Sequence, residues 1–582
     1  MLKLKTQALL SLLFLTISSG AQTRVPFIKS LEYPNKWVDS VFRKLNKKER
    51  IAQLLMVRAH TNKGKAYEDS VAEVIKKQRV GGLVFFQGGP ARQAALTNYY
   101  QSLSHIPLLI AMDGEWGLGM RLDSAVSYPF QMTLGALKDT PLVYETGREV
   151  AKDFRRLGMH VNFAPVVDIN NNPANPVINY RSFGDNKYNV AAKAWAYTKG
   201  MQDEGLLVSL KHFPGHGDTD VDSHLALPQL KFDRNRLDSL EMYPFRELIK
   251  KGASGVMVAH MNIPALDRTE NLPSTLSKPI ITGILKTELA FKGLVFTDAM
   301  EMKGVVKFFP EGEADIRALA AGNDVLELSE NSARAIKLIR KAVKKKRISK
   351  DQINASVKKV LAAKYWAGLN NFQPVDTANV AGFLNRPETF ALKQRLAAAA
   401  VTVLNSDSLL KALDLNKKTA VISLGVTRVS SFQEDMKLKF PNSTNFILSK
   451  IAGSLDIAGM LKELKGYEQI IMAIHDYRKR PLSTLDYNNE LKLFIAEAAR
   501  LNTVTVLFAN PYTIAGLPGI EQSKTLIVNY QNTEEMYKAS VNVLTGRAGT
   551  NGRLPVTVNS FFKTGDGIEF FPEPKQVSGQ VE

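Results

Sequence analysis

Short apolar runs alternate with amphipathic stretches from about residue 35 to residue 370. Stretches such as 69–78 and 142–157 repeat apolar positions at helical spacing, and each lies between two runs of strand length. Strands and helices that alternate in this way build a parallel sheet. Eight such units predict a closed (β/α)8 barrel of the TIM type. The eight apolar runs are Leu54–Ala59, Gly82–Phe86, Pro107–Asp113, Val161–Asp168, Leu207–Phe213, Gly255–Met261, Leu294–Asp298 and Asp324–Leu328.

A second α/β unit is predicted beyond the barrel. The stretch 370–377 is polar and loop-like, and the chain up to about residue 398 is helical in character. More apolar runs follow with helices between most of them, which predicts an open sheet. We therefore expect a barrel domain over 22–370, a linker over 371–398 and a second domain over 399–582. The runs are Val401–Leu404, Ala420–Leu424, Asn445–Leu448, Gln469–His475, Val504–Phe508, Leu526–Asn529 and Leu554–Val558.

The first 21 residues have the pattern of a cleaved secretory signal. Lys3 and Lys5 give a basic start, 8–15 is apolar, and the small residues 19–21 precede a cleavage point after Ala21. The apolar part is too short to span a bilayer. We expect a mature protein without an integral membrane segment, exported to the periplasm or the cell exterior.

The absence of cysteine limits the possible catalytic chemistry, and the net charge limits the possible binding partners. The chain has no cysteine, which excludes thiolate catalysis and cysteine metal sites and fits an exported protein that relies on large cores. Its formal net charge of +20 favours anionic polymers, and outside the cytoplasm these are envelope polymers rather than nucleic acid. A generally basic, solvated surface is the alternative, because the basic run 341–347 lies on a probable helix and needs no partner.

Proton-transferring side chains are densest between Lys211 and His224, which hold three of the eight histidines and three aspartates. An apolar run precedes this segment, and Pro214 interrupts regular structure, so the pattern predicts a strand followed by a loop. His212 and His216 have the spacing of two metal ligands on a helix, but the proline removes that helix. A metal site is therefore disfavoured.

Two interpretations of the loop remain. It can be a purely structural polar turn, since Asp, Gly, Pro and His all suit turns. Alternatively Asp222, two residues before His224, holds that imidazole in one tautomer and stabilises its protonated form. His224 would then be a general acid and base near neutral pH, which is the interpretation we favour.

Polar side chains also close five of the eight barrel runs. In a (β/α)8 barrel these ends converge on one face, where active sites are built. A capping or turn role stays open for Asp113 and Asp168 taken singly. The strand-end residues are Asp113, Asp168, the pair Lys211 and His212, His260 and Asp298.

Asp298 is the candidate nucleophile. A carboxylate held at a strand end beside basic residues stays ionised and can attack an electrophilic carbon. Glycosidases pair such a carboxylate with a separate proton donor, and retaining enzymes pass through a covalent glycosyl-enzyme.

Three segments together resemble glycoside hydrolase family 3, in its β-N-acetylglucosaminidase branch. They are the stretch 211–218 with Asp222-Ser223-His224, the stretch 112–115, and Phe296-Thr297-Asp298. The resemblance covers about 35–370, and its most specific element is the loop from His212 to His224, because the β-glucosidase branch lacks the Asp-Ser-His ending. The region beyond resembles, more weakly, the C-terminal α/β sandwich of two-domain members.

The resemblance assigns roles to individual residues. It implies that Asp298 is the nucleophile, His224 the general acid and base, and Asp222 the partner that orients His224. One departure stands out: the family's usual Asp-Gln-Glu-Gly-Gly-Arg is here Asp-Gly-Glu-Trp-Gly-Leu. We therefore expect the surroundings of the first sugar to differ, and Trp116 to change what is accepted beyond it. The implied substrate-binding residues are Asp113, Arg121, Arg181, Lys211 and His212.

The implied activity is that of a secreted, retaining exo-β-N-acetylglucosaminidase acting on cell-wall or chitin-type sugars. Its partner is a GlcNAc-containing glycan, and the reaction needs two side chains and water but no metal or cofactor. A β-glycosidase or β-GlcNAc phosphorylase of other specificity is one alternative. A catalytically silent sugar-binding protein is another, although such a protein would be expected to have lost Asp298 or His224, and both are present.

Overall fold

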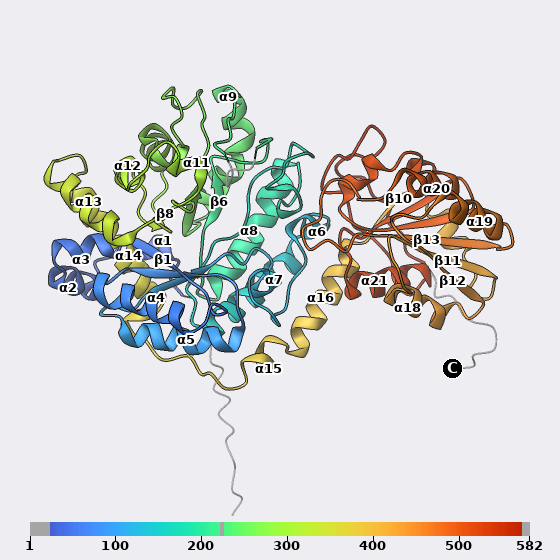
Figure 1. Cartoon of the computed structure of the whole chain (residues 1–582), viewed down its shortest axis with the longest axis horizontal. Helices are drawn as coiled ribbons and strands as arrows, with labels where there is room; N and C mark the ends of the chain where they lie inside the picture. Colours follow the sequence, from blue (N-terminus) through green and yellow to red (C-terminus); the bar gives the residue numbers. More distant parts are fainter. Residues whose placement is uncertain (1–23, 222–225, 573–582) are drawn as a thin grey trace, which may run out of the picture.

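The computed structural model describes residues 24–221 and 226–572. The chain forms two lobes, a larger one built from the N-terminal two thirds and a smaller one built from the rest (Figure 1). Helices α15 (Val380–Leu384) and α16 (Pro387–Ala400) run from the first lobe to the second. The predicted signal sequence, together with Asp222 and His224, lies outside the described residues.

The larger lobe is a closed parallel barrel. One sheet has the order β5-β4-β3-β2-β1-β9 and the other the order β6-β7-β8, with parallel pairing throughout. Strands β5 and β6 are two halves of one position, separated at Ser209, and a parallel bridge from Phe296 to Val325 joins β8 to β9. The strands are β1 Leu55–Ala59, β2 Gly82–Phe85, β3 Leu109–Met112, β4 Val161–Asn162, β5 Leu207–Val208, β6 Leu210–Phe213, β7 Gly255–Val258, β8 Leu294–Thr297 and β9 Leu326–Glu327.

Every one of these strands lies within a predicted apolar run, so the barrel is confirmed. Its strands are buried along their whole length apart from two half-buried positions in β1, which is why each run is apolar without alternation. Beneath the mouth the interior is filled by side chains such as Phe163 and Phe296, whose rings meet edge to face at 5.3 Å. The inside of the barrel is therefore a packed core rather than a channel.

Helices cover the outside of the barrel. Two of them pack closely because each presents a glycine: a Cβ on Gly147 of α7 would lie 2.3 Å from the carbonyl oxygen of Tyr197, and one on Gly200 of α8 would lie 2.2 Å from that of Tyr144. The helices are α1 Phe27–Ser30, α2 Lys36–Lys44, α3 Lys47–Ala52, α4 Lys65–Gln78, α5 Pro90–Leu103, α6 Gln131–Gly135, α7 Pro141–Arg156, α8 Lys187–Asp203, α9 Arg234–Arg236, α10 Tyr243–Lys250, α11 Lys303–Val306, α12 Glu313–Ala321, α13 Ser332–Lys344 and α14 Lys350–Trp366.

Short 3-10 and π-helical segments complete the connections. The 3-10 segments are η1 Leu118–Met120, η2 Asn179–Arg181, η4 Ser274–Leu276, η6 Leu369–Asn371, η7 Pro511–Gly516 and η8 Ile520–Gln522, and the π-helical segments are η3 Leu237–Glu241 and η5 Pro279–Glu288. In the described ranges, no helix is long and apolar enough to cross a membrane.

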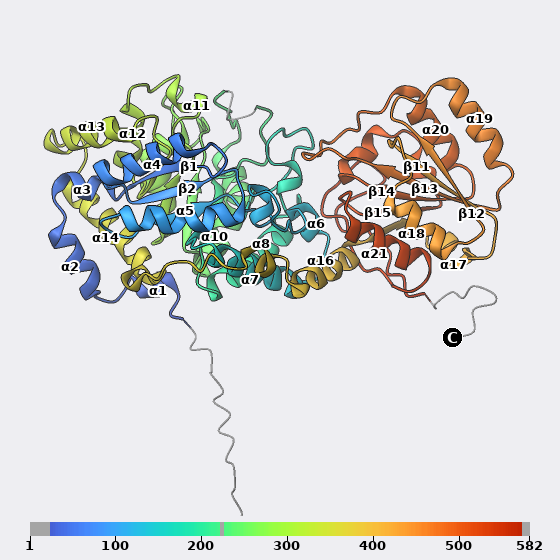
Figure 2. The same ribbon diagram turned by 60° about the horizontal axis from the view of Figure 1, so that its bottom comes forward.

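The smaller lobe is an α/β sandwich around a sheet of order β10-β15-β14-β13-β11-β12, in which only the β10–β15 pair is antiparallel. Helices α19 and α20 cover one face, and α18 and α21 the other (Figure 2). The strands are β10 Thr402–Asn405, β11 Thr419–Leu424, β12 Ser443–Leu448, β13 Gln469–His475, β14 Thr503–Phe508 and β15 Thr525–Val528. The helices are α17 Ser408–Ala412, α18 Ser431–Lys439, α19 Ser454–Leu464, α20 Asn489–Ala499 and α21 Glu534–Leu544.

The predicted strand over Leu554–Val558 is wrong. Part of its backbone bonds to the barrel lobe: the Pro555 carbonyl accepts from the Asp185 N–H at 3.1 Å, and the Thr557 N–H donates to the Asp185 carboxylate at 2.7 Å. The N–H groups of Leu554 and Val558 donate to nearby carbonyls of the second lobe, those of Asp566 and Phe562. Pro555 also has no N–H to offer a sheet. The apolar run is buried in the contact between the lobes, which imitates the pattern of a strand.

Polar contacts fix the second lobe beside the barrel mouth. Asn170 donates to the Tyr512 hydroxyl at 2.7 Å, Asn179 donates to Ser483 at 2.7 Å, and the Phe130 N–H donates to Gln531 at 2.7 Å. The barrel partners all lie in loops that follow β3 or β4. Loops of the smaller lobe are thereby held over the barrel's carboxyl-terminal face.

Candidate active site

A cavity of about 1380 Å³ opens at the carboxyl ends of the barrel strands and extends beneath the second lobe. All the described residues that were predicted to be catalytic or substrate-binding line it. They are Asp113, Arg121, Arg181, Lys211, His212 and Asp298. The predicted catalytic pair Asp222 and His224 belongs to the loop after β6 but lies outside the described residues.

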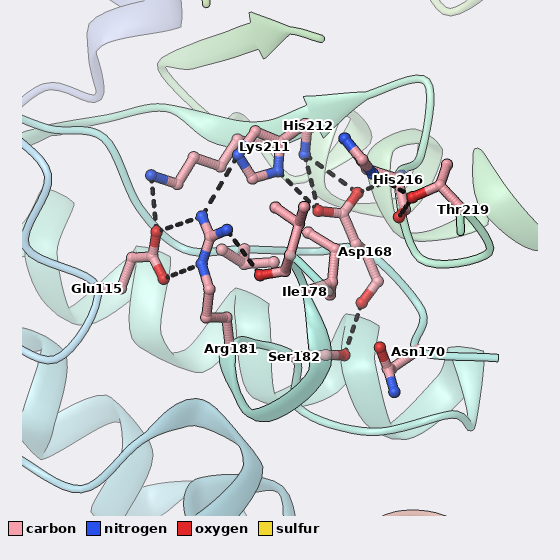
Figure 3. A network of polar contacts seen from close by, with 12 residues as sticks. Glu115, Asp168, Asn170, Ile178, Arg181, Ser182, Lys211, His212, His216 and Thr219 are labelled. Carbon is pink, nitrogen blue, oxygen red and sulfur yellow. Dashed lines mark hydrogen bonds and ion pairs between the residues drawn. The ribbon is translucent and has the colours of Figure 1, made fainter. Parts of the chain in front are cut away.

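Two carboxylates and three cations form an ion-pair lattice in the inner part of the cavity. Figure 3 shows the part of it that Glu115, Lys211 and Arg181 make. Lys211 Nζ donates to Asp113 at 2.8 Å and to Glu115 at 2.9 Å. Arg121 also donates to Asp113, at 2.6 Å. Arg181 donates to Glu115 through two nitrogens, at 2.9 and 2.7 Å. Lys211 of β6 therefore joins two ion pairs whose members come from the loops after β3 and β4.

The lattice keeps both carboxylates ionised. Burial alone would raise the pKa of Asp113, but Lys211 and Arg121 outweigh it and hold that pKa well below its usual range. Burial also opposes ionisation of Glu115, where Arg181 and Lys211 lower the pKa to about 2. Charged donors and acceptors at fixed positions suit the recognition of several sugar hydroxyls.

Asp168 orients His212 from behind the cavity wall. Its carboxylate accepts the backbone N–H groups of His212 at 3.1 Å and His216 at 2.7 Å, and it lies 2.8 Å from His212 Nδ1. Because a carboxylate only accepts, Nδ1 carries the proton and Nε2 faces Arg181 at 3.5 Å. Asp168 is buried and does not line the cavity, so it supports His212 and does not itself face the cavity.

The side chain of His216 contacts Thr219, although its backbone N–H bonds Asp168. Its Nδ1 lies 2.8 Å from the Thr219 hydroxyl, and burial lowers its pKa to about 4. In the ranges 24–221 and 226–572, no group of three or more His, Asp or Glu residues is arranged to hold a metal ion.

Asp298 directly follows β8 and lines the cavity. Its backbone N–H donates to the Val258 carbonyl at 3.0 Å, and its Oδ1 accepts the Ala299 N–H at 2.8 Å. His260, also predicted at the rim, is fully buried and lies outside the cavity lining. Its Nε2 is 3.1 Å from the Ala299 carbonyl, so it supports the turn that carries Asp298.

Glu327 is a cavity residue that the sequence interpretation missed. It ends β9, only 3% of it is exposed, and its N–H donates to Thr297 Oγ1 at 2.9 Å. Burial, and then the charges of Asp113 and Asp298, raise its pKa well above the usual value. It is the penultimate residue of the eighth apolar run, so a strand-end rule like the one that selected Asp113 and Asp298 was the signal that could have found it.

The outer wall of the cavity joins the two lobes. From the barrel side come Trp116, Phe130 and Tyr180, with ring centroids 4.8 Å apart for Trp116 and Phe130 and 4.7 Å for Phe130 and Tyr180. From the second lobe come Lys479 and Arg480 in the loop after β13. Local sequence patterns carried no signal for these second-lobe residues, because they reach the cavity only through tertiary packing.

Comparison with known proteins decides the family. Residues 47–363, more than half of the chain, match the glycosyl hydrolase family 3 N terminal domain. The chain belongs to glycosyl hydrolase family 3. As a member of this family it is a glycoside hydrolase, and the carbohydrate-binding chemistry of the cavity agrees with that assignment.

Similar proteins of this family extend over both lobes. Beta-hexosaminidase A of Pseudoalteromonas piscicida is 29% identical over 84% of this chain and 91% of its own. A beta-N-acetylglucosaminidase/beta-glucosidase of Cellulomonas fimi is 25% identical over 89% of this chain and 95% of its own. The solved family 3 beta-N-acetylglucosaminidase of Paenibacillus sp. str. FPU-7 is 31% identical, covers 88% of this chain and 99% of its own, and has a TM-score of 0.74.

Proposed function

We propose that this glycoside hydrolase is an exported, retaining exo-β-N-acetylglucosaminidase that removes terminal β-GlcNAc from cell-wall or chitin-type saccharides. The observation that carries the proposal is the position of Asp298, fixed at the end of β8 in the same cavity as the Asp113–Lys211–Glu115 lattice. The names of the relatives that span both lobes support the choice of sugar.

The reaction we propose has two steps. Asp298 attacks the anomeric carbon, the glycosidic C–O bond breaks, and His224, oriented by Asp222, gives its proton to the departing oxygen. Water then attacks the same carbon, returns a proton to His224 and releases Asp298 from the glycosyl ester. Both steps use only side chains of this chain and water.

The blind inner end of the cavity supports exo action. Packed aromatic side chains fill the barrel beneath it, and the ion-pair lattice lines its inner part. A terminal sugar fits such a site, whereas an internal unit would need a second exit. The outer volume, bounded by Trp116 and the second lobe, is then left for the next unit of the saccharide.

Charge at the outer wall supports an acidic aglycone of the cell-wall type. Lys479 and Arg480 are exposed, and neither has an ion-pair partner among the residues that the structure describes. The net charge of +20 acts in the same direction over a longer range. Export rests on the sequence pattern of residues 1–21, and is tested by the N-terminus of the secreted protein, which should be Gln22.

The activity is tested by release of nitrophenol from three substrates, the N-acetyl-β-glucosaminide, the β-glucoside and the N-acetyl-β-galactosaminide. We expect the first to have the highest kcat/KM. A higher value for the β-glucoside would overturn the proposed specificity while leaving the family assignment in place.

A further inference from the structure

Glu327 is held rigidly in the wall of the cavity, although neither the fold nor the proposed reaction step requires a carboxyl group there. Its N–H donates to Thr297 at 2.9 Å, its carbonyl accepts from the Met300 N–H at 2.9 Å, and it pairs with Met56 of β1. The backbone is therefore bound to both neighbouring strands, so the carboxyl group has a fixed position beside the segment that carries Asp298.

One oxygen of the carboxyl group lacks a hydrogen-bond partner among the described residues. This atom is the buried Oε2. Buried polar atoms in folded proteins are nearly always bonded, and an exception commonly marks a functional site. Because the residue lines the cavity, its carboxyl group can reach a ligand that is bound there.

The surrounding charges disfavour an anion at this position. Asp113 after β3 and Asp298 after β8 both act on Glu327 as negative charges, while Lys211 of β6 and Arg121 after η1 act as positive ones. Both cations are already bonded to Asp113, at 2.8 and 2.6 Å.

The neighbouring strand adds no free positive charge. Arg58 of β1 also lines the cavity, but it forms an ion pair with Glu301. Burial and like charges thus keep the proton on Glu327.

We propose that Glu327 is a substrate-contacting acid that stays protonated in the free protein and donates its carboxyl O–H to the bound sugar. This rests on the proposed glycosidase function. A neutral carboxyl group both donates and accepts, as a sugar hydroxyl does, whereas the ionised Asp113 and Glu115 only accept and Lys211 only donates. Glu327 therefore supplies a combination that the ion-pair lattice lacks.

Two substitutions separate the neutral acid from a merely structural side chain. Glu327→Gln keeps a donor and an acceptor but cannot ionise, and Glu327→Met keeps the length without either. Asp315→Asn is the matched control, because burial raises the pKa of Asp315 to about 6 while its side chain bonds Ser329 away from the cavity.

The kinetic test uses kcat/KM for a nitrophenyl glycoside against pH, since that leaving group departs without a proton from the general acid. We expect the parent protein to lose kcat/KM as rising pH ionises Glu327. Glu327→Gln should not show this loss, and Glu327→Met should have an about tenfold higher KM at every pH. Asp315→Asn should follow the parent. An unchanged KM in Glu327→Met, or the same alkaline loss in Glu327→Gln, would overturn the proposal.

Thermal unfolding decides the protonation state even if no glycoside is cleaved. A group whose pKa is raised by folding contributes stability below its unfolded pKa and loses it as pH rises through the folded pKa. The parent should therefore melt progressively lower than Glu327→Gln as pH rises. If the melting temperatures of the parent and of Glu327→Gln change in parallel with pH, Glu327 is not a neutral acid. If these melting temperatures diverge but neither the parent nor any variant cleaves a glycoside, only the glycosidase proposal is refuted.

Discussion

Replacing Lys211 by Met should destabilise the barrel in a pH-dependent way. Lys211 is buried and bridges Asp113 at 2.8 Å and Glu115 at 2.9 Å. Removing one partner of a buried ion pair costs about 3–5 kcal/mol, and the lower end applies here because Arg121 and Arg181 stay bonded to the two carboxylates.

The pKa of Glu115 gives a similar magnitude. It falls from 4.5 to about 2, which corresponds to about 3 kcal/mol at ~1.4 kcal/mol per unit, shared between Arg181 and Lys211. A carboxyl group whose pKa is lowered by folding contributes stability above its unfolded pKa and loses it as pH falls through the folded pKa. The difference between parent and variant should therefore be constant above pH 4.5 and shrink between pH 4.5 and 2.

The assay is thermal unfolding of the parent, Lys211→Met and Lys65→Met from acidic to neutral pH. Lys65 is 70% exposed and pairs with Asp69 in solvent, so its loss should leave the stability close to that of the parent. Equal stability of Lys211→Met and the parent near neutral pH would refute the claim that the ion pairs of Lys211 stabilise the barrel. A difference that persists undiminished down to pH 2 would show that Lys211 acts through packing rather than through the carboxylates.

Three further results are expected. His224→Ala should harm GlcNAc disaccharides far more than nitrophenyl glycosides, because only the poor leaving group needs a proton; equal losses on both substrates would return this loop to a sugar-binding role. Asp222→Ala should show the same pattern in milder form, with added azide restoring part of the second step in kinetic assays. The double change of Lys479 and Arg480 to Ala should raise KM for a disaccharide with a carboxylated aglycone about tenfold and leave KM for neutral chitobiose within about twofold; equal effects on both would argue against an acidic aglycone.

The barrel was predictable because its strands are buried on both faces and therefore continuously apolar. The rule that polar strand-end residues converge also placed Asp113, Lys211 and Asp298 in one cavity. It did not separate lining residues from supporting ones, since Asp168 and His260 also end apolar runs but lie behind the wall. Whether a side chain at a strand end faces the cavity depends on the conformation of the following loop, and local sequence patterns do not encode that conformation.

The contribution of the second lobe could not be predicted in the same way. Arg480 reaches the cavity because contacts such as Asn179 to Ser483 dock the loop after β13 onto the barrel, and such contacts leave no periodic signal. The error at Leu554–Val558 has the same origin. An apolar run buried between two lobes has the composition of a strand, although part of its backbone bonds to the other lobe rather than to a sheet.

The central claim is that Asp298 is the nucleophile of a retaining glycosidase. Asp298→Asn keeps the shape and removes the attacking charge, so turnover should fall by at least about 10³-fold with the fold intact. The most direct measurement is mass spectrometry of peptides after inactivation by a 2-fluoro glycoside, which traps the glycosyl ester. The account predicts the label on the peptide that contains Asp298; a label on another carboxylate, such as Asp113 or Glu327, would contradict it.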